Sequence, residues 1–129
     1  MPDDELILLI EDHPLNLKLL RDLLRVVGYH TVEATTAQAG IDAALAHKPR
    51  LVLLDIQLPD SDGLEVLTRL RSDPRTAAIP VLALTASAMS HDRERILDAG
   101  FDGYLAKPID IWVLLDEVRQ RCGEPLSDI

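Results

Sequence analysis

The chain has 129 residues, the size of one globular domain with a substantial core. It carries 22 acidic against 13 basic side chains, and the resulting net charge of −9 argues against direct nucleic-acid binding. Its single cysteine excludes an internal disulfide framework, and no apolar run approaches the roughly 18 residues of a membrane span. The acidic N-terminus is unlike a basic secretory signal, so we expect a soluble, cytoplasmic protein.

The first half of the chain alternates short apolar runs with helical patterns. Residues 6–10 are continuously apolar, as in a strand buried on both faces, and Glu11 and Asp12 follow them. A helix is expected from Pro14 until Gly28 ends it. Residues 29–34 form a less apolar strand, expected at an edge of the sheet, and Thr36 can cap an alanine-rich helix that runs to about residue 47.

The second half repeats this alternation. Residues 51–54 predict a buried strand that ends at Asp55, and Pro59 and Gly63 shape the loop after it. A helix is expected from residue 64 until just before residue 72, then a strand over 79–84 that ends at Thr85. A polar helix over 91–99 and a strand over 101–106 follow, and the strand ends at Lys107.

The last helical pattern begins after Asp110, which can cap it. Helical geometry then turns Trp112 toward solvent, where it would anchor a partner or lie flat over neighbouring apolar surface. The side chains expected to face inward are Ile111, Leu114, Leu115 and Val118.

Five strand–helix alternations in about 120 residues predict a doubly wound α/β fold, with a five-stranded parallel sheet flanked by five helices. Right-handed crossovers place the carboxyl ends of all five strands at one edge of the sheet. We expect residues 1–129 to form a single domain, with a core over about 5–121 and a tail over 122–129.

Charged and polar side chains follow the expected strands at that edge. Converging carboxylates repel one another unless a hard cation joins them, and Mg²⁺ suits an oxygen-rich site that leaves room for a phosphate oxygen. A lysine and a hydroxyl can hold the remaining phosphate oxygens, and a carboxylate can itself become a phosphoryl acceptor. The residues in question are Glu11, Asp12, Asp55, Thr85 and Lys107.

Four segments in this order resemble the receiver domain of two-component response regulators, across about residues 5–121. They are Glu11-Asp12, Asp55-Ile56-Gln57-Leu58-Pro59 with Gly63, Leu84-Thr85-Ala86, and Tyr104-Leu105-Ala106-Lys107-Pro108. The resemblance implies a CheY-like, flavodoxin-like sheet with strand order 2-1-3-4-5. It also implies that Asp55 accepts a phosphoryl group from a histidine kinase or a histidine phosphotransfer protein.

The same resemblance assigns the other site residues. Mg²⁺ would be held by Glu11, Asp12, Asp55 and the backbone carbonyl of Gln57. Phosphate binding and switching would involve Thr85, Ala86, Lys107 and Tyr104. Phosphorylation would draw Thr85 inward, let the Tyr104 ring follow, and remodel the face formed by the fourth helix, fifth strand and fifth helix. In physical terms, the added phosphoryl charge would bias an element that has two conformations.

We therefore expect a phosphoacceptor signalling domain without other catalytic turnover, which is a monomer or a phosphorylation-dependent dimer. It would contact its downstream partner through that face, to which Tyr104 and Trp112 would contribute. One alternative is a receiver module cut from a hybrid kinase or a multidomain regulator. Another is a metal-dependent phosphatase with an aspartyl nucleophile, although Gln57 stands where that chemistry usually has a second acid. A third is a receiver-like interaction module that works without phosphorylation.

Overall fold

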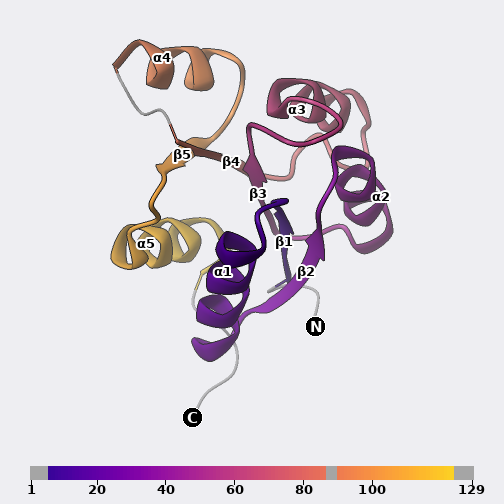
Figure 1. Ribbon diagram of the computed structural model, residues 1–129. Coiled ribbons are helices and arrows are strands. Elements are labelled where there is room, and N and C mark those ends of the chain that lie inside the picture. The colour runs from indigo at the N-terminus through magenta and orange to yellow at the C-terminus, as the bar shows by residue number, and fades with distance from the viewer. Residues whose placement is uncertain (1–5, 87–89, 124–129) are drawn as a thin grey trace.

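The computed structural model describes residues 6–86 and 90–123, in which five strands and five helices alternate along the chain (Figure 1). The strands are β1 (Leu6–Ile10), β2 (His30–Ala34), β3 (Leu51–Asp55), β4 (Val81–Thr85) and β5 (Gly103–Ala106). The helices are α1 (Pro14–Val26), α2 (Ala37–His47), α3 (Gly63–Ser72), α4 (Ser90–Asp98) and α5 (Ile111–Cys122).

All neighbouring strands pair in parallel, in the order β2-β1-β3-β4-β5. The order confirms the doubly wound fold and the strand arrangement that the resemblance implied. β2 is added on one side of β1, and β3 on the other, so the strand order reverses between β1 and β3, which both lie inside the sheet. Open α/β sheets bind ligands at such a switch point. β2 lies at one edge, as its less apolar sequence indicated.

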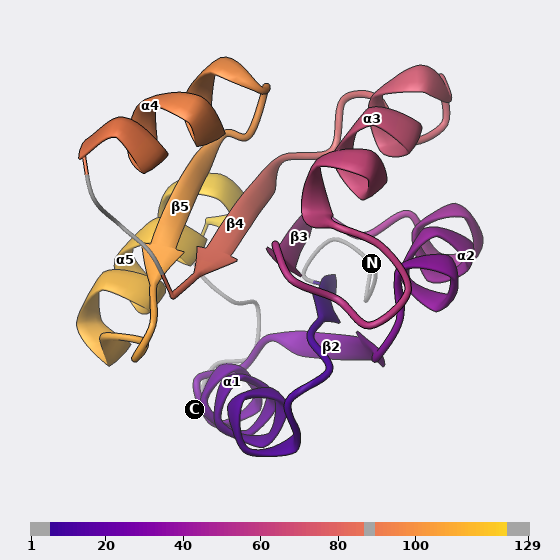
Figure 2. The ribbon, with the colours of Figure 1, turned by 45° about the horizontal axis from the view of Figure 1, so that its top comes forward.

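Helices cover both faces of the sheet, with α1 and α5 on one face and α2, α3 and α4 on the other (Figures 1 and 2). Alternate strand residues supply the two cores, because successive side chains of a strand point to opposite faces. Leu8, Ile10, Val52 and Leu54 belong to the first core cluster, with α2 and α3. Ile7, Leu9, Leu51 and Leu53 belong to the second, with α1 and α5.

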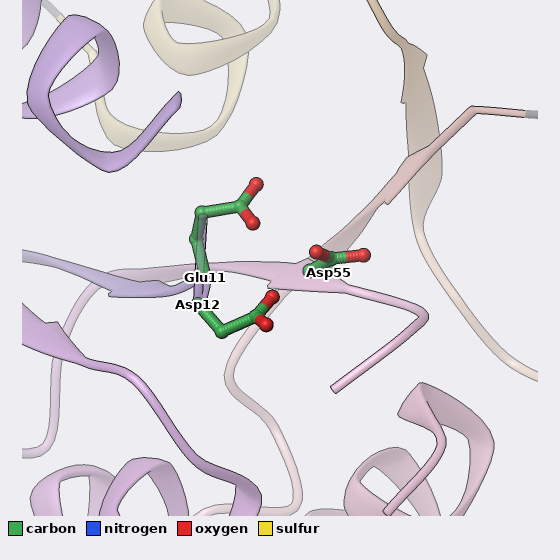
Figure 3. Close-up of side chains that lie close together, drawn as sticks. All are labelled: Glu11, Asp12 and Asp55. Atoms are coloured by element: carbon green, nitrogen blue, oxygen red, sulfur yellow. The ribbon is translucent and has the colours of Figure 1, made fainter. Parts of the chain in front are cut away.

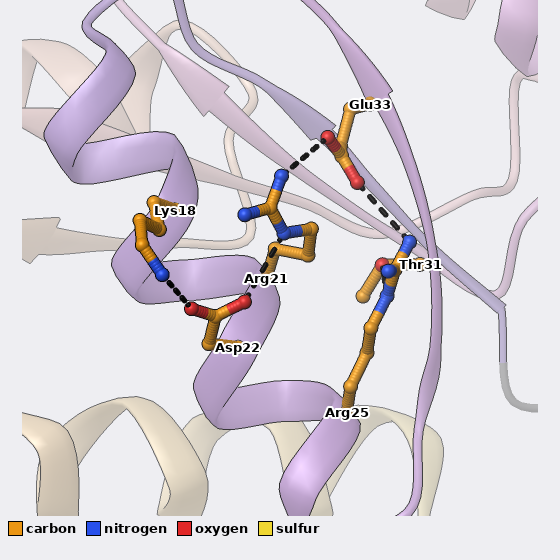
Figure 4. A network of polar contacts seen from close by, with 6 residues as sticks. All are labelled: Lys18, Arg21, Asp22, Arg25, Thr31 and Glu33. Atoms are coloured by element: carbon orange, nitrogen blue, oxygen red, sulfur yellow. Dashed lines mark hydrogen bonds and ion pairs between the residues drawn. The ribbon is translucent and has the colours of Figure 1, made fainter.

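The polar face of α1 is joined to the edge strand β2 by a network of ion pairs and hydrogen bonds (Figure 4). The guanidinium groups of Arg21 and Arg25 both donate to the carboxylate of Glu33, and Arg25 also donates to the Thr31 hydroxyl. Exposed pairs of this kind contribute little each. Together they cover part of an edge strand with charged side chains, which discourages pairing with other strands.

Several element boundaries differ from the expected ones. β4 begins at Val81 rather than at residue 79, and β5 begins at Gly103 rather than at residue 101. Phe101 instead closes the end of α4, since its backbone N–H donates to the carbonyl of Ile96. α5 extends to Cys122, one residue into the expected tail, and residues 124–129 of that tail lie outside the described part of the chain.

One core residue of the last helix was predicted wrongly. Leu114, Leu115 and Val118 are buried as expected, but Ile111 is 40% exposed. Ile111 is the first residue of α5, and helical side chains lean toward the N-terminus, so its side chain extends past the start of the helix. Trp112 is 80% exposed, which confirms the expected orientation.

No helix in the described ranges is long and apolar enough to cross a membrane.

Candidate functional site

The carboxyl ends of the strands gather the predicted polar residues at one edge of the sheet. Glu11 and Asp12 directly follow β1, Asp55 and Thr85 are the last residues of β3 and β4, and Lys107 directly follows β5. Adjacent strands run side by side to these ends, with Asp55 opposite Leu84 in the register of β3 and β4. The sheet topology alone therefore brings together residues that are far apart in the sequence.

Three carboxylates form the centre of this arrangement (Figure 3). One oxygen from each of Glu11, Asp12 and Asp55 lies within 4.8 Å of the others. Glu11 is fully buried and Asp55 is nearly so, whereas Asp12 is exposed. The cluster therefore has a buried side against the protein and an open side toward solvent.

Lys107 faces two of the three acids from the end of β5. Its Nζ lies 2.9 Å from Glu11 Oε1 and 3.0 Å from Asp55 Oδ2. The backbone also ties Lys107 to β4, because its N–H donates to the Thr85 carbonyl at 2.8 Å. One ammonium is thus shared between two buried carboxylates.

Burial and this ion pairing together shift the pKa values of Glu11 and Lys107. Burial, and next the neighbouring Asp55, raises the pKa of Glu11, and the ammonium of Lys107 opposes that rise. Burial would lower the pKa of Lys107, but its pairing with Glu11 and Asp55 outweighs burial and raises it. The lysine therefore stays charged while the carboxylates compete for it.

The site has more negative charge than its own lysine can balance. Among the described residues, Glu11 Oε1 is buried without a hydrogen bond of good geometry and depends on the ion pair with Lys107. Three carboxylates that converge at a surface opening supply hard oxygen donors, the ligands that Mg²⁺ prefers. The residues present therefore fit a divalent cation.

The loop after Asp55 turns back on itself within a few residues. Gly63 N–H donates to the Ile56 carbonyl at 2.6 Å, and Gln57 bridges to Asp62. A Cβ on Gly63 would lie 2.8 Å from the Ile56 Cα, so this close approach requires glycine. Gln57 N–H donates to Asp55 Oδ1 at 2.9 Å, which fixes the carboxylate relative to the loop.

A cleft of about 510 Å³ opens beside Asp55. It includes the predicted residues Asp12, Asp55, Gln57, Thr85, Ala86 and Lys107. Asn16 and Arg95 also line it and were not predicted. Asn16 lies in the first turn of α1, and the signal that could have indicated it is a polar side chain at the start of the helix that follows Glu11 and Asp12.

The remaining predicted residues lie outside this cleft. Tyr104 is half-buried on β5, and its hydroxyl accepts a hydrogen bond from Arg93 of α4 at 3.0 Å. It lines a separate groove together with Leu97 and Val113, between α4, β5 and α5. Trp112 projects from α5 into solvent.

Comparison with known proteins identifies the family. Residues 7–119 match the sequence model of the response regulator receiver domain, and the chain belongs to this family. It is 40% identical to the polar-differentiation response regulator DivK of Brucella anthropi over 118 residues, which cover 92% of this chain and 96% of DivK. DivK of Brucella abortus matches equally well.

Solved structures support the same assignment. The receiver domain of a sensor histidine kinase from Pseudomonas aeruginosa is 32% identical, with a TM-score of 0.84 over 93% of this chain and 98% of that one. That structure contains a magnesium ion coordinated in its active-site cleft. A receiver domain protein from Methanospirillum hungatei is 27% identical, with a TM-score of 0.82 over 92% of this chain and 93% of that one.

Proposed function

We propose that this receiver domain accepts a phosphoryl group on Asp55 in the presence of Mg²⁺ and passes the signal to a protein partner. The observation that supports this most is the carboxylate cluster of Glu11, Asp12 and Asp55 with the Lys107 ammonium 3.0 Å from Asp55. A nucleophilic carboxylate next to a fixed positive charge and a cation site is the arrangement that phosphoryl transfer needs, because the protein mainly positions groups and neutralises charge.

In the proposed step, a carboxylate oxygen of Asp55 attacks the phosphorus of a phosphohistidine. The new P–O bond forms as the P–N bond breaks, and the departing imidazole takes up a proton as it leaves. The Mg²⁺ ion would be held by Glu11, Asp12, Asp55 and the Gln57 carbonyl, and it would neutralise charge that develops on the phosphoryl oxygens. Lys107 would bind another of these oxygens.

The switch would follow from the contacts that the phosphoryl group takes over. Lys107 is connected to β4 through the Thr85 carbonyl, and Thr85 and Ala86 line the cleft beside Asp55. We expect the Thr85 hydroxyl to move toward the phosphoryl group. Tyr104, at present hydrogen-bonded to Arg93, would then follow into the space released by Thr85 and change the face made by α4, β5 and α5.

A histidine kinase or a histidine phosphotransfer protein is the proposed donor, and a protein that contacts the α4–β5–α5 face is the proposed receiver of the signal. We propose that residues 1–129 act as one receiver domain, as the match along nearly all of DivK supports. A module that belongs to a larger kinase stays the alternative, which the 32% identity to a sensor kinase receiver supports. Direct nucleic-acid binding is not proposed, given the net charge of −9.

Acetyl phosphate with Mg²⁺, followed by intact-mass spectrometry, tests the central step. The wild type should gain one phosphoryl group, and Asp55→Asn should gain none. Asp116→Asn is the control, because it removes one negative charge from an exposed position on α5. An adduct of equal yield on Asp55→Asn would contradict the proposal. Release of many equivalents of phosphate per protein would instead favour the aspartyl phosphatase.

A further inference from the structure

Residues 56–63, called the arm below, leave the site after Asp55 and return to it at the start of α3. Bonds inside the arm fix its shape. Gly63 N–H donates to the Ile56 carbonyl at its base, and Leu58 N–H donates to the Ser61 carbonyl near its tip. These bonds join the two sides of the arm to each other. At its base the arm is also fixed to the sheet, because Ile56 N–H donates to the Leu84 carbonyl at 3.1 Å.

A contact at the tip holds the far end of the arm. Asp60 Oδ1 accepts a hydrogen bond from the Ala37 N–H at 2.7 Å, and Oδ2 accepts one from the Gln38 N–H at 3.2 Å. Both donors belong to the first turn of α2, where backbone N–H groups have no partner within the helix. Figure 2 shows the arm crossing from β3 to the start of α2 before it returns to α3.

The first turn of α2 is itself fixed to the core. Ala37 is buried, and the Thr36 hydroxyl separately accepts from the Ala39 N–H. Gly40 lies so close to β1 that a Cβ there would be 2.5 Å from the Ile10 side chain. Ile10 immediately precedes Glu11 and Asp12. Through Asp60, the arm is therefore held against the helix that packs on β1, the strand that Glu11 and Asp12 directly follow.

We propose that Asp60 is a positioning residue for the cation site. This inference depends on the proposed function, since it concerns the Mg²⁺ that the carboxylate cluster would hold. Asp60 acts through the arm. It holds the segment that contains Gln57, so the Gln57 carbonyl and the Asp55 carboxylate keep a fixed relation to Glu11 and Asp12. Binding is favourable only where the ligands of a small, geometrically demanding ion are already in place.

The competing explanation is that Asp60 merely caps α2 and stabilises the fold. Hydrogen bonds from the backbone N–H groups, first that of Ala37, hold the pKa of Asp60 below its usual range, as either explanation requires. A Thr36→Ala variant distinguishes the two explanations. Thr36→Ala also removes a side-chain bond to the first turns of α2, but Thr36 has no place in the arm.

The experiment measures the Mg²⁺ dissociation constant of the full chain by titration with magnesium chloride, followed by amide NMR shifts near Asp55. Thermal unfolding is recorded for the same samples. Asp60→Ala should weaken Mg²⁺ binding about tenfold, the lower end of the range for residues that orient metal ligands. Asp60→Asn should lie between Asp60→Ala and the wild type, because its amide oxygen can still accept from Ala37. Thr36→Ala should lower the unfolding temperature but change Mg²⁺ affinity less than about twofold.

Equal Mg²⁺ affinity in Asp60→Ala and the wild type would overturn the positioning role and leave the proposed function intact. Equal weakening in Asp60→Ala and Thr36→Ala would also overturn it, because fraying of α2 would then explain both. A wild type without saturable shifts would remove the cation site, and the positioning role with it. If Asp60→Ala does not fold, the comparison is made between Asp60→Asn and the wild type.

Discussion

Asp55→Asn should make the protein more stable when no divalent cation is present. The substitution keeps the size of the side chain and one of its two oxygens. Gln57 N–H and Lys107 contact different oxygens of Asp55, so the asparagine oxygen can accept from only one of them. The substitution removes one of two buried carboxylates that compete for a single ammonium. Lys107 is not left uncompensated, because Glu11 remains 2.9 Å from it.

The distances give the sign and the size of the effect. At an effective dielectric constant of about 20, an ion pair at 3.0 Å is worth about 5–6 kcal/mol, and two like charges no more than 4.8 Å apart repel by at least about 3–4 kcal/mol. Asp55 has one attractive partner and two repulsive ones, and solvent partly screens the exposed Asp12, so the contacts nearly cancel and leave about 1 kcal/mol of net repulsion. Its burial adds a desolvation penalty that asparagine lessens. We therefore expect the free energy of unfolding to rise by about 1–3 kcal/mol.

Urea unfolding followed by circular dichroism measures this change, first with EDTA and then with Mg²⁺. A cation that binds only the folded wild type adds about 1.4 kcal/mol at ten times its dissociation constant, so added Mg²⁺ should narrow the difference. The control is Asp116→Asn, which makes the same change of charge where Gln120 is the neighbour. An Asp55→Asn variant no more stable than the wild type in EDTA would refute the reasoning.

Three further outcomes follow from other parts of the chain. Arg71 donates hydrogen bonds to two carbonyls of the segment before β4 and to Asp102. Arg71→Met should therefore lower the free energy of unfolding by about 2–3 kcal/mol in urea titrations. Arg69→Met, which removes one exposed hydrogen bond, should change it little. Burial raises the pKa of Cys122 from 9.0 to about 11, so folding favours the thiol form, and this stabilisation is complete below pH 9 and is lost as pH rises through about 11. At pH 8, iodoacetamide should therefore label Cys122 far more slowly in the native protein than in the urea-unfolded chain, as measured by mass spectrometry. Trp112→Ala should leave folding and Asp55 phosphorylation nearly unchanged but weaken association with a partner or a second copy, and equal sedimentation of mutant and wild type, with and without beryllium fluoride, would contradict that role.

The fold could be predicted from the sequence because its signals are local. Continuous apolar runs identified β1 and β3, and Thr36 and Asp110 cap α2 and α5 as their side chains indicated. Boundaries were less certain where tertiary contacts decide them. The Asp102 carboxylate, for example, accepts hydrogen bonds from the N–H of Val81 and from the Arg71 guanidinium. These two bonds order the turn before β5. Arg71 and Asp102 are 31 residues apart, and Asp60 and Ala37 are 23 apart, so no local pattern selects either pair.

The membership of the acidic cluster could likewise be predicted, because parallel strands with right-handed crossovers end at one edge. Its electrostatics could not, because the burial of each acid depends on tertiary packing around the ends of the strands. The sequence placed three acids at this edge but did not indicate their burial, and Glu11 is enclosed while Asp12 is open to solvent. The enclosed Glu11 holds Lys107 at 2.9 Å, so a phosphoryl group on Asp55, as proposed, would have to compete with Glu11 for the ammonium. A cation bound by Glu11 would weaken that competitor, since a carboxylate that coordinates a metal attracts the lysine less. Under the proposed function, cation binding by Glu11 would therefore favour the movement of the Lys107 ammonium from Glu11 to the phosphoryl group.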